Sequence, residues 1–246
     1  MTTPRRRLPA VAALVAVLAV VAGGGYGLWY LFLRPAGPAA VNTGSQAPLA
    51  TTGAAAEPLA SGGLADTWDV DTTIGSFADF SDSWVGYRMQ ETLASIGANT
   101  AVGRTPKVSG TLTITGTQVT AATITADLTA LQSDDSRRDG QLDHNGLETS
   151  SFPTATFTLT SPLDLGTDPT SGQEIDVTAQ GTLDLHGVTK TVAVPLKARL
   201  VGSIIEVTGS LPITLADYGM TPPTSFIALS VSDAGTLELQ LLLTHA

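Results

Sequence analysis

The feature that most constrains the fold is an alternation of apolar and polar side chains with a period of two. From residue 122 to 128, apolar residues alternate with Thr and Asp, and a similar pattern runs from 192 to 200. Successive side chains of a β-strand point to opposite faces, so this alternation predicts strands with one buried face and one solvated face. It recurs in seven or more segments after Asp66. The chain is therefore expected to form an all-β domain.

Turn signals separate these segments at short intervals. Gly116 and Thr117 interrupt two alternating runs, and His186 and Gly187 interrupt two more. Strands joined by such short turns pair with their neighbours in an antiparallel meander. A meander of this size must hide its edges, most simply by closing into a barrel. Residues 133–151 lack the alternation and carry many charges, which predicts an irregular or briefly helical crossover.

The N-terminal residues 1–33 have the pattern of a membrane anchor. Three arginines at 5–7 precede 26 uncharged residues, 8–33. A helix of that length reaches about 39 Å, enough to cross the ~30 Å hydrocarbon layer of a bilayer. The basic flank predicts an N-terminus inside the cell membrane and a C-terminal domain on the extracytoplasmic side. The alternative is a secretory signal peptide cleaved after Ala22, which would release the same domain.

A linker, residues 34–65, is expected between this anchor and the β domain, residues 66–246. Ala, Gly, Pro, Ser and Thr make up 24 of its 32 residues. Such a composition buries too little apolar surface to offset the entropy of ordering, which predicts a disordered tether. As a flexible coil it would span about 30 Å.

Charge and composition exclude several classes of function. From Asp66 onward, 21 acidic residues face 8 basic ones, a net charge of −13, which makes binding to nucleic acid improbable. The absence of cysteine removes thiol catalysis and thiolate metal sites. His144, His186 and His245 are far apart, and Asp69 and Asp71 lack the further ligands of a calcium loop. We predict no catalytic residue, no metal site and no cofactor.

Several phrases of the sequence, taken in order, resemble the YceI-like family of lipocalin-like, polyisoprenoid-binding domains. The resemblance covers about residues 68–244. Its motifs are the opening phrase at 68–71, the Arg138–Asp139 pair, the phrase at 152–157, the phrase at 181–190 and the acidic-aromatic-glycine turn at 217–219. It implies an elongated eight-stranded antiparallel barrel in an exported protein, whose interior holds a long hydrophobic lipid of the isoprenoid or quinone type.

The inward face of such a barrel supplies the candidate ligand-binding residues. An eight-stranded barrel is just wide enough to be filled by its own side chains or to hold one slender ligand. Several positions expected inside are alanines, which leaves room for a ligand. The alternative is that neighbouring Leu and Ile fill this room, which would make the domain a solid-cored interaction module displayed on the cell surface. The expected lining comprises Ala122, Ile124, Ala126, Phe157, Leu159, Val177, Ala179, Val194, Leu196 and Ala198.

Arg138 is the candidate for contact with a lipid head group. Its planar guanidinium suits phosphate oxygens, so it could bind a pyrophosphate at the mouth of the barrel. The alternative is a structural role, in which Arg138 and Asp139 lock the crossover to the end of the barrel through ion pairs and hydrogen bonds. The sequence alone favours the structural role.

Overall fold

The computed structural model describes residues 38–41, 64–94, 97–166, 172–222 and 228–246. The predicted membrane anchor and most of the predicted linker lie outside these residues. Among the helices that are described, none combines the length and the hydropathy needed to span a membrane.

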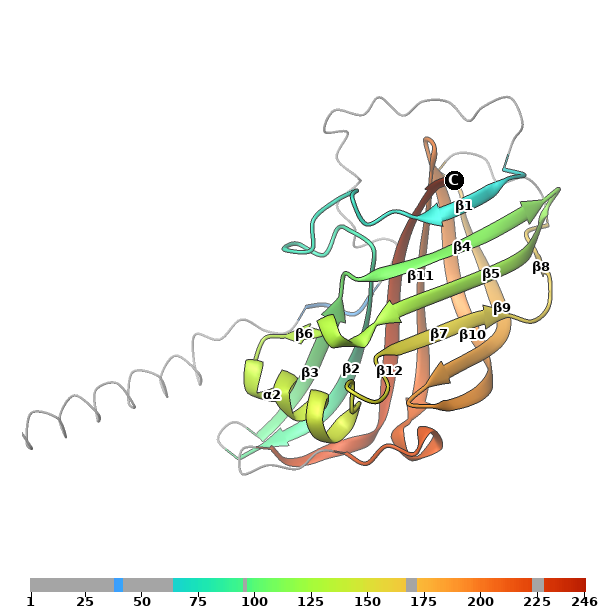
Figure 1. Ribbon diagram of the computed structural model, residues 1–246. Coiled ribbons are helices and arrows are strands. Elements are labelled where there is room, and N and C mark those ends of the chain that lie inside the picture. The colour runs from blue at the N-terminus through green and yellow to red at the C-terminus, as the bar shows by residue number, and fades with distance from the viewer. Residues whose placement is uncertain (1–37, 42–63, 95–96, 167–171, 223–227) are drawn as a thin grey trace, which may run out of the picture.

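The alternating segments form the expected closed barrel, shown in Figure 1. Its ring closes because the last strand pairs with the first, in the register Val70 with Leu243 and Trp68 with His245. All the strand pairings are antiparallel, as the local turns predicted. The eight strands of the ring are, in chain order, β1 (Thr67–Val70), β4 (Val108–Thr115), β5 (Gln118–Asp127), β7 (Thr154–Leu159), β9 (Glu174–Leu185), β10 (Val188–Val201), β11 (Ile204–Thr214) and β12 (Ala228–His245).

A hairpin extends the sheet beside the ring. One edge of β12 pairs with β11, and the other pairs with β1 near its end and with β2 (Trp84–Leu93) along the rest of its length. One edge of β12 therefore pairs with two different strands, β1 and β2. β2 continues into β3 (Gly97–Thr105), and the two-residue β6 (Gln132–Ser133) pairs with β3. A second short strand, β8 (Leu163–Asp164), pairs with β5.

The register of the strands agrees with the inward face that the alternation of apolar and polar residues predicts. Val194 lies opposite Ala179, and Leu196 lies opposite Val177, with these side chains on the inner face. The alternating run that begins at residue 122 ends sooner than expected. Leu128 begins the 3₁₀ turn η2 (Leu128–Ala130), whose preceding residue Asp127 accepts a hydrogen bond from the Thr129 amide. A second turn, η4 (Leu215–Tyr218), follows β11.

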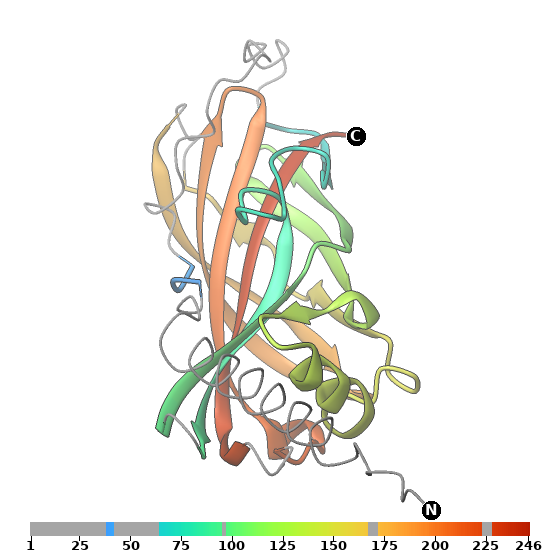
Figure 2. The same ribbon diagram turned by 90° about the vertical axis from the view of Figure 1, so that its left-hand side faces the viewer.

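The predicted crossover closes one end of the barrel, called here the crossover end (Figure 2). It contains the helix α2 (Ser136–Gln141) and a π-helical turn, η3 (Leu142–Gly146). Asp135 starts the helix because its carboxylate accepts a hydrogen bond from the Arg137 amide, which has no partner within the helix.

Buried apolar side chains form two clusters. Trp68 and Leu243, both fully buried, belong to the cluster at the end of the barrel where β1 lies. Met89 and Leu185 belong to the cluster at the crossover end. Tyr87 packs against this second cluster and lies close to the backbone of Gly103. A Cβ atom on Gly103 would lie 2.4 Å from the Tyr87 ring.

The outer surface of the β2–β3 hairpin holds a short piece of the predicted linker, residues 38–41, drawn in blue in Figure 1. Arg88 donates a hydrogen bond of 2.8 Å to the carbonyl of Pro38, and Arg104 donates one of 3.2 Å to that of Ala39. The amide of Val41 donates to Glu238, which also pairs with Arg88 at 3.1 Å. These four residues of the linker are therefore bound to the barrel.

Candidate functional site: an apolar cavity inside the barrel

A cavity of about 610 Å³ lies inside the barrel. Side chains from every strand of the ring except β1 line it, together with β2, β3 and the crossover. Small residues on facing strands leave the space open. They include Ala101, Ala122, Ala126, Ala155, Ala179 and Ala198. Because the wall is almost wholly hydrocarbon, the cavity suits an apolar ligand.

The structure places all ten of the predicted lining residues on the wall of this cavity. Phe157 is one of the few aromatic residues among them, and its ring packs over Gly181, where a Cβ atom would lie 2.4 Å away. Their position on the wall follows from the pleat of the strands. Their contact with a ligand stays a prediction.

The β2–β3 hairpin adds wall residues that the sequence reasoning missed. Val85, Tyr87, Met89 and Glu91 all line the cavity from β2, and Ala101 does so from β3. The alternation that predicts inward-facing residues was present in β2, since these four residues occupy alternate positions. It was weak because the run is interrupted by a glycine and contains charged residues on both faces.

Arg138 lies at the crossover end of the cavity and is bound by carboxylates. Its Nη2 donates to Glu91 Oε1 at 2.6 Å, and its Nη1 donates to Asp134 Oδ1 at 2.5 Å. Burial acts to lower the pKa of Arg138, but the two carboxylates outweigh it and hold the pKa above its ordinary value. The guanidinium therefore stays charged and joins the crossover to β2.

These contacts are those expected of the structural role considered for Arg138. Asp139, its neighbour in the sequence, accepts hydrogen bonds from the amide and the hydroxyl of Ser133. Glu91 is 7% exposed and accepts a further hydrogen bond from Asn99 at 2.6 Å. The network thus joins β2, β3, β6 and α2 at one end of the cavity.

Tyr87 places an unpaired hydroxyl near this network. Its ring forms part of the cavity wall, and its hydroxyl has no hydrogen-bond partner among the described residues. Burial raises the pKa of this hydroxyl above its usual value, although the charge of Arg138 opposes the shift. The hydroxyl therefore remains protonated and can donate a hydrogen bond.

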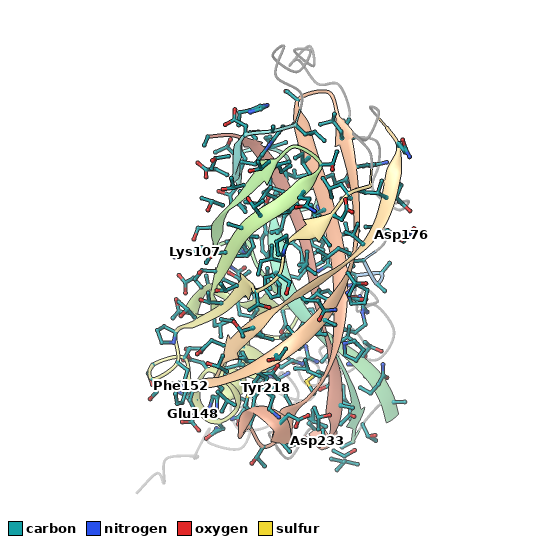
Figure 3. All side chains as sticks on the ribbon, turned by 90° about the vertical axis from the view of Figure 1, so that its right-hand side faces the viewer. Lys107, Glu148, Phe152, Asp176, Tyr218 and Asp233 are labelled. Carbon is teal, nitrogen blue, oxygen red and sulfur yellow. The ribbon has the colours of Figure 1, made fainter. Side chains whose placement is uncertain are left out.

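The three histidines are not brought together. His186 lies in the predicted turn, its Nδ1 3.1 Å from the Tyr218 carbonyl and its ring against Phe152, and Figure 3 shows Phe152 and Tyr218 at the crossover end. His245 packs against Trp68, and His144 is exposed. Within the described part of the chain, no group of three or more His, Cys, Asp or Glu side chains could hold a metal ion.

Asp69 is part of β1, and Asp71 follows the strand. Asp71 accepts hydrogen bonds from the amide and the hydroxyl of Thr73, both at 2.7 Å, as is usual at the start of a turn.

A closed antiparallel barrel around an apolar cavity defines a lipocalin-like barrel. Comparison with family models is more specific, since the model described as "YceI-like domain" matches residues 68–243. The chain therefore belongs to the YceI-like domain family, which confirms the resemblance inferred from the sequence motifs. A comparison with curated proteins finds no match.

Two solved structures share the fold. A polyisoprenoid binding domain from Saccharophagus degradans, implicated in plant cell wall breakdown, is 21% identical, with a TM-score of 0.55, and the match covers 73% of this chain and 98% of that one. BcnA from Burkholderia cenocepacia is 19% identical, with a TM-score of 0.50, and the match covers 70% and 98%. Both likenesses agree with the eight-stranded closed barrel.

Proposed function

We propose that this protein is a membrane-tethered, extracytoplasmic binding protein that holds a hydrophobic isoprenoid or similar lipid inside its barrel, for storage or transport. The observation that carries the proposal is the apolar cavity of about 610 Å³. Membership of the YceI-like family supports it, as does the likeness to a domain described as polyisoprenoid binding.

The cavity has the size and chemistry that such a ligand needs. Sites for small molecules commonly have volumes of about 300–1,000 Å³, and this one falls within that range. Each 100 Å² of apolar ligand surface removed from water contributes about 2.5 kcal/mol. Part of that gain offsets the loss of ligand freedom. Apolar contact alone is thus sufficient to hold a long isoprenoid chain, and no catalytic group is needed.

Tethering to a membrane completes the proposal. It rests on the 26 uncharged residues behind three arginines and would keep the barrel beside a source of lipid. The alternative of a secreted carrier rests on cleavage after Ala22. The alternative of a solid-cored interaction module is disfavoured by the cavity.

Lipid extraction tests the proposal. Denaturing organic extraction of the purified full-length chain, followed by mass spectrometry, should recover an isoprenoid or quinone, and the emptied protein should take up added polyprenol. Repeated recovery of no lipid, together with no uptake, would contradict the proposal.

A pair of variants on β10 makes this test specific. Ala198 lines the cavity, whereas Ala193 is exposed on the outer face of the same strand. Ala198→Phe should reduce polyprenol uptake at least tenfold because the added ring occupies the cavity. Ala193→Phe introduces the same ring outside and should leave uptake unchanged. Equal uptake by the two variants would place the lipid elsewhere.

A further inference from the structure

Residues 38–41 contact the barrel through their main chain. The carbonyls of the first two residues accept hydrogen bonds of 2.8 and 3.2 Å from two guanidinium groups, and the amide of the fourth donates to a carboxylate at 3.3 Å. Every residue of a peptide offers a carbonyl, and every residue except proline offers an amide hydrogen. The three side chains that bind these groups, called here the outer site, are Arg88, Arg104 and Glu238.

Buried contacts hold the outer site in place. Arg104 is 4% exposed, and its guanidinium carbon lies 3.8 Å from the centre of the Trp84 ring and 4.3 Å from that of Phe80. Glu238 is 3% exposed and pairs with both arginines, at 3.1 Å with Arg88 and 3.9 Å with Arg104. These cation–π contacts and ion pairs orient the guanidinium groups for a peptide, which lowers the entropy lost on binding.

The linker repeats the bound segment. The sequence reads Pro-Ala-Ala-Val at 38–41, Pro-Leu-Ala-Thr at 48–51 and Pro-Leu-Ala-Ser at 58–61, a spacing of ten residues. In the bound segment the first and fourth residues are half-buried, and the second and third are exposed. The second repeat keeps Pro at the first position, and its fourth residue, Thr, branches at Cβ as Val does. The change from Ala to Leu falls on an exposed position, so the second repeat also fits the outer site.

Chain length decides which repeats can reach the outer site. The carbonyl of Leu64 accepts a hydrogen bond from Trp68, which lies opposite His245 in the register. Glu238 lies seven positions earlier in β12, about 23 Å along the strand. The interval from residue 51 to 64 covers at most about 47 Å, and that from 61 to 64 at most about 11 Å. The second repeat can therefore replace the first, whereas the third cannot while Leu64 remains bound.

The first repeat is the preferred occupant, since it is the one found in the outer site. Its half-buried Val41 places a methyl group where Thr51 would place a hydroxyl, which needs a hydrogen-bond partner. The chain before Leu64 acts in the opposite direction, because closing a loop of 12 residues costs less than closing one of 22. That difference favours the second repeat by only about twofold to threefold. The second repeat is therefore a minor competitor.

We propose that the outer site binds an extended peptide of the form Pro-x-Ala followed by Val or Thr, and that the repeats at 38–41 and 48–51 exchange in it. The proposal goes beyond lipid binding and does not depend on the cavity. The bound repeat sets how much of the linker separates residues 1–33 from the barrel, which is four residues for the first repeat and 14 for the second. The linker thus acts at two lengths.

Substitution by proline tests the exchange, because proline lacks the amide hydrogen that Glu238 accepts. Val41→Pro removes this hydrogen from the first repeat. The second repeat should then occupy the outer site, and the Thr51 amide should exchange with solvent at least threefold more slowly than in the wild-type chain. NMR of the full-length chain measures the exchange of each amide. Equal exchange of Thr51 in the two proteins would overturn the proposal.

Two controls show whether the slow exchange arises at the outer site. Adding Arg88→Ala to Val41→Pro removes one donor of the site and should restore fast exchange at Thr51. In Val41→Pro alone, the Ser61 amide should exchange at the wild-type rate because the third repeat cannot reach the site. Slow exchange of Thr51 without Arg88, or of Ser61 to the same degree, would assign the protection to another part of the molecule and refute the proposal.

A free peptide tests recognition of the main chain directly. A capped, fluorescent peptide of residues 46–53 should bind the double variant Val41→Pro/Thr51→Pro, in which neither repeat can donate to Glu238. It should bind the wild-type chain at least fivefold more weakly, because the first repeat competes at a high effective concentration. The same peptide carrying Thr51→Pro is the control and should not bind. Fluorescence anisotropy measures the affinities, and equal binding of the two peptides would contradict the proposed role of Glu238.

Polyprenol uptake separates this proposal from the proposed lipid binding. Val41 does not line the cavity, so Val41→Pro should take up polyprenol as the wild-type chain does. Normal uptake together with unchanged exchange at Thr51 would refute the peptide site and leave lipid binding intact. Slow exchange at Thr51 in a chain that takes up no polyprenol would support the peptide site and count against lipid binding.

Discussion

At the scale of the residue, Asp82 has an environment unusual for a carboxyl group. It is 4% exposed on the outer side of the barrel, and its Oδ1 atom has no hydrogen-bond partner among the described residues. Burial raises the pKa of Asp82 to about 6, and the nearby charge of Asp79 adds to the rise. A raised folded-state pKa means that folding favours the protonated form.

This pKa predicts how stability changes with pH. The contribution of Asp82 is present below pH 3.8 and is lost as the pH rises through about 6. Asp82→Asn removes the buried charge and should raise the free energy of unfolding at pH 7.5 by about 1–3 kcal/mol, with little gain at pH 4. Denaturant unfolding at both pH values measures the difference.

The control for this prediction is Asp176→Asn, at a side chain that is 76% exposed. It should change stability by less than about 0.5 kcal/mol at either pH. A stability gain from Asp82→Asn that is equal at the two pH values would show that the buried charge is not its cause.

At the scale of the element, the β2–β3 hairpin depends on close packing between its strands. Gly103 lies opposite Tyr87 in the register, and a Cβ atom there would meet the ring at 2.4 Å. Gly103→Ala should destabilise the protein by about 1–3 kcal/mol because the ring must move. Thermal unfolding provides the measurement.

The same substitution in α2 is the matched control. A Cβ atom on Gly140 would meet no atom within 4 Å, so Gly140→Ala should stabilise the protein by about 0.5–1 kcal/mol through its gain in helix propensity. If both substitutions were neutral, close contact with Tyr87 would not constrain residue 103.

The elements also show how far the sequence predicts this fold. β10 was predictable along nearly its whole length, because Val194 and Leu196 alternate with outward residues and the period of a strand is two. The two-residue strands β6 and β8 were not predictable, since two residues carry no period and their pairing depends on distant partners. The helical turn at Leu128 was missed because it depends on local hydrogen bonds that the Asp127 carboxylate accepts from the amide and the hydroxyl of Thr129.

The candidate site, like the fold, was only partly predictable from the sequence. The inward face of the barrel was predicted correctly because the pleat fixes which side chains face the cavity. The ion pairs of Arg138 were considered only as one of two alternatives. Glu91 lies 47 positions away in the sequence, and no local pattern brings the two together. The unpaired hydroxyl of Tyr87 is likewise visible only in three dimensions.

At the scale of the whole molecule, residues 38–41 bind the barrel at a site remote from them in sequence. Arg88 holds the Pro38 carbonyl at 2.8 Å, and Glu238 accepts from the Val41 amide. Arg88→Ala removes the first contact and loosens the second, so exchange of the Val41 amide hydrogen should accelerate at least tenfold. Hydrogen exchange followed by mass spectrometry or NMR measures this.

Arg199→Ala is the control for this prediction. Arg199 likewise pairs with a buried carboxylate, that of Glu206, at 2.5 Å, but it belongs to β10 and binds no residue of 38–41 in the described contacts. Its loss should leave exchange at Val41 unchanged. Equal exchange in the wild-type chain and in Arg88→Ala would contradict the predicted role of Arg88.

The bound residues 38–41 shorten the distance over which the proposed tether can act. If residues up to 33 form the predicted membrane helix, only residues 34–37 separate that helix from Pro38. A fully extended chain covers that interval in at most about 18 Å, against about 30 Å for a free linker of 32 residues. The attachment point on β2, β3 and β12 would then set which side of the barrel faces the bilayer. The protein would approach lipid in one preferred orientation rather than by free rotation.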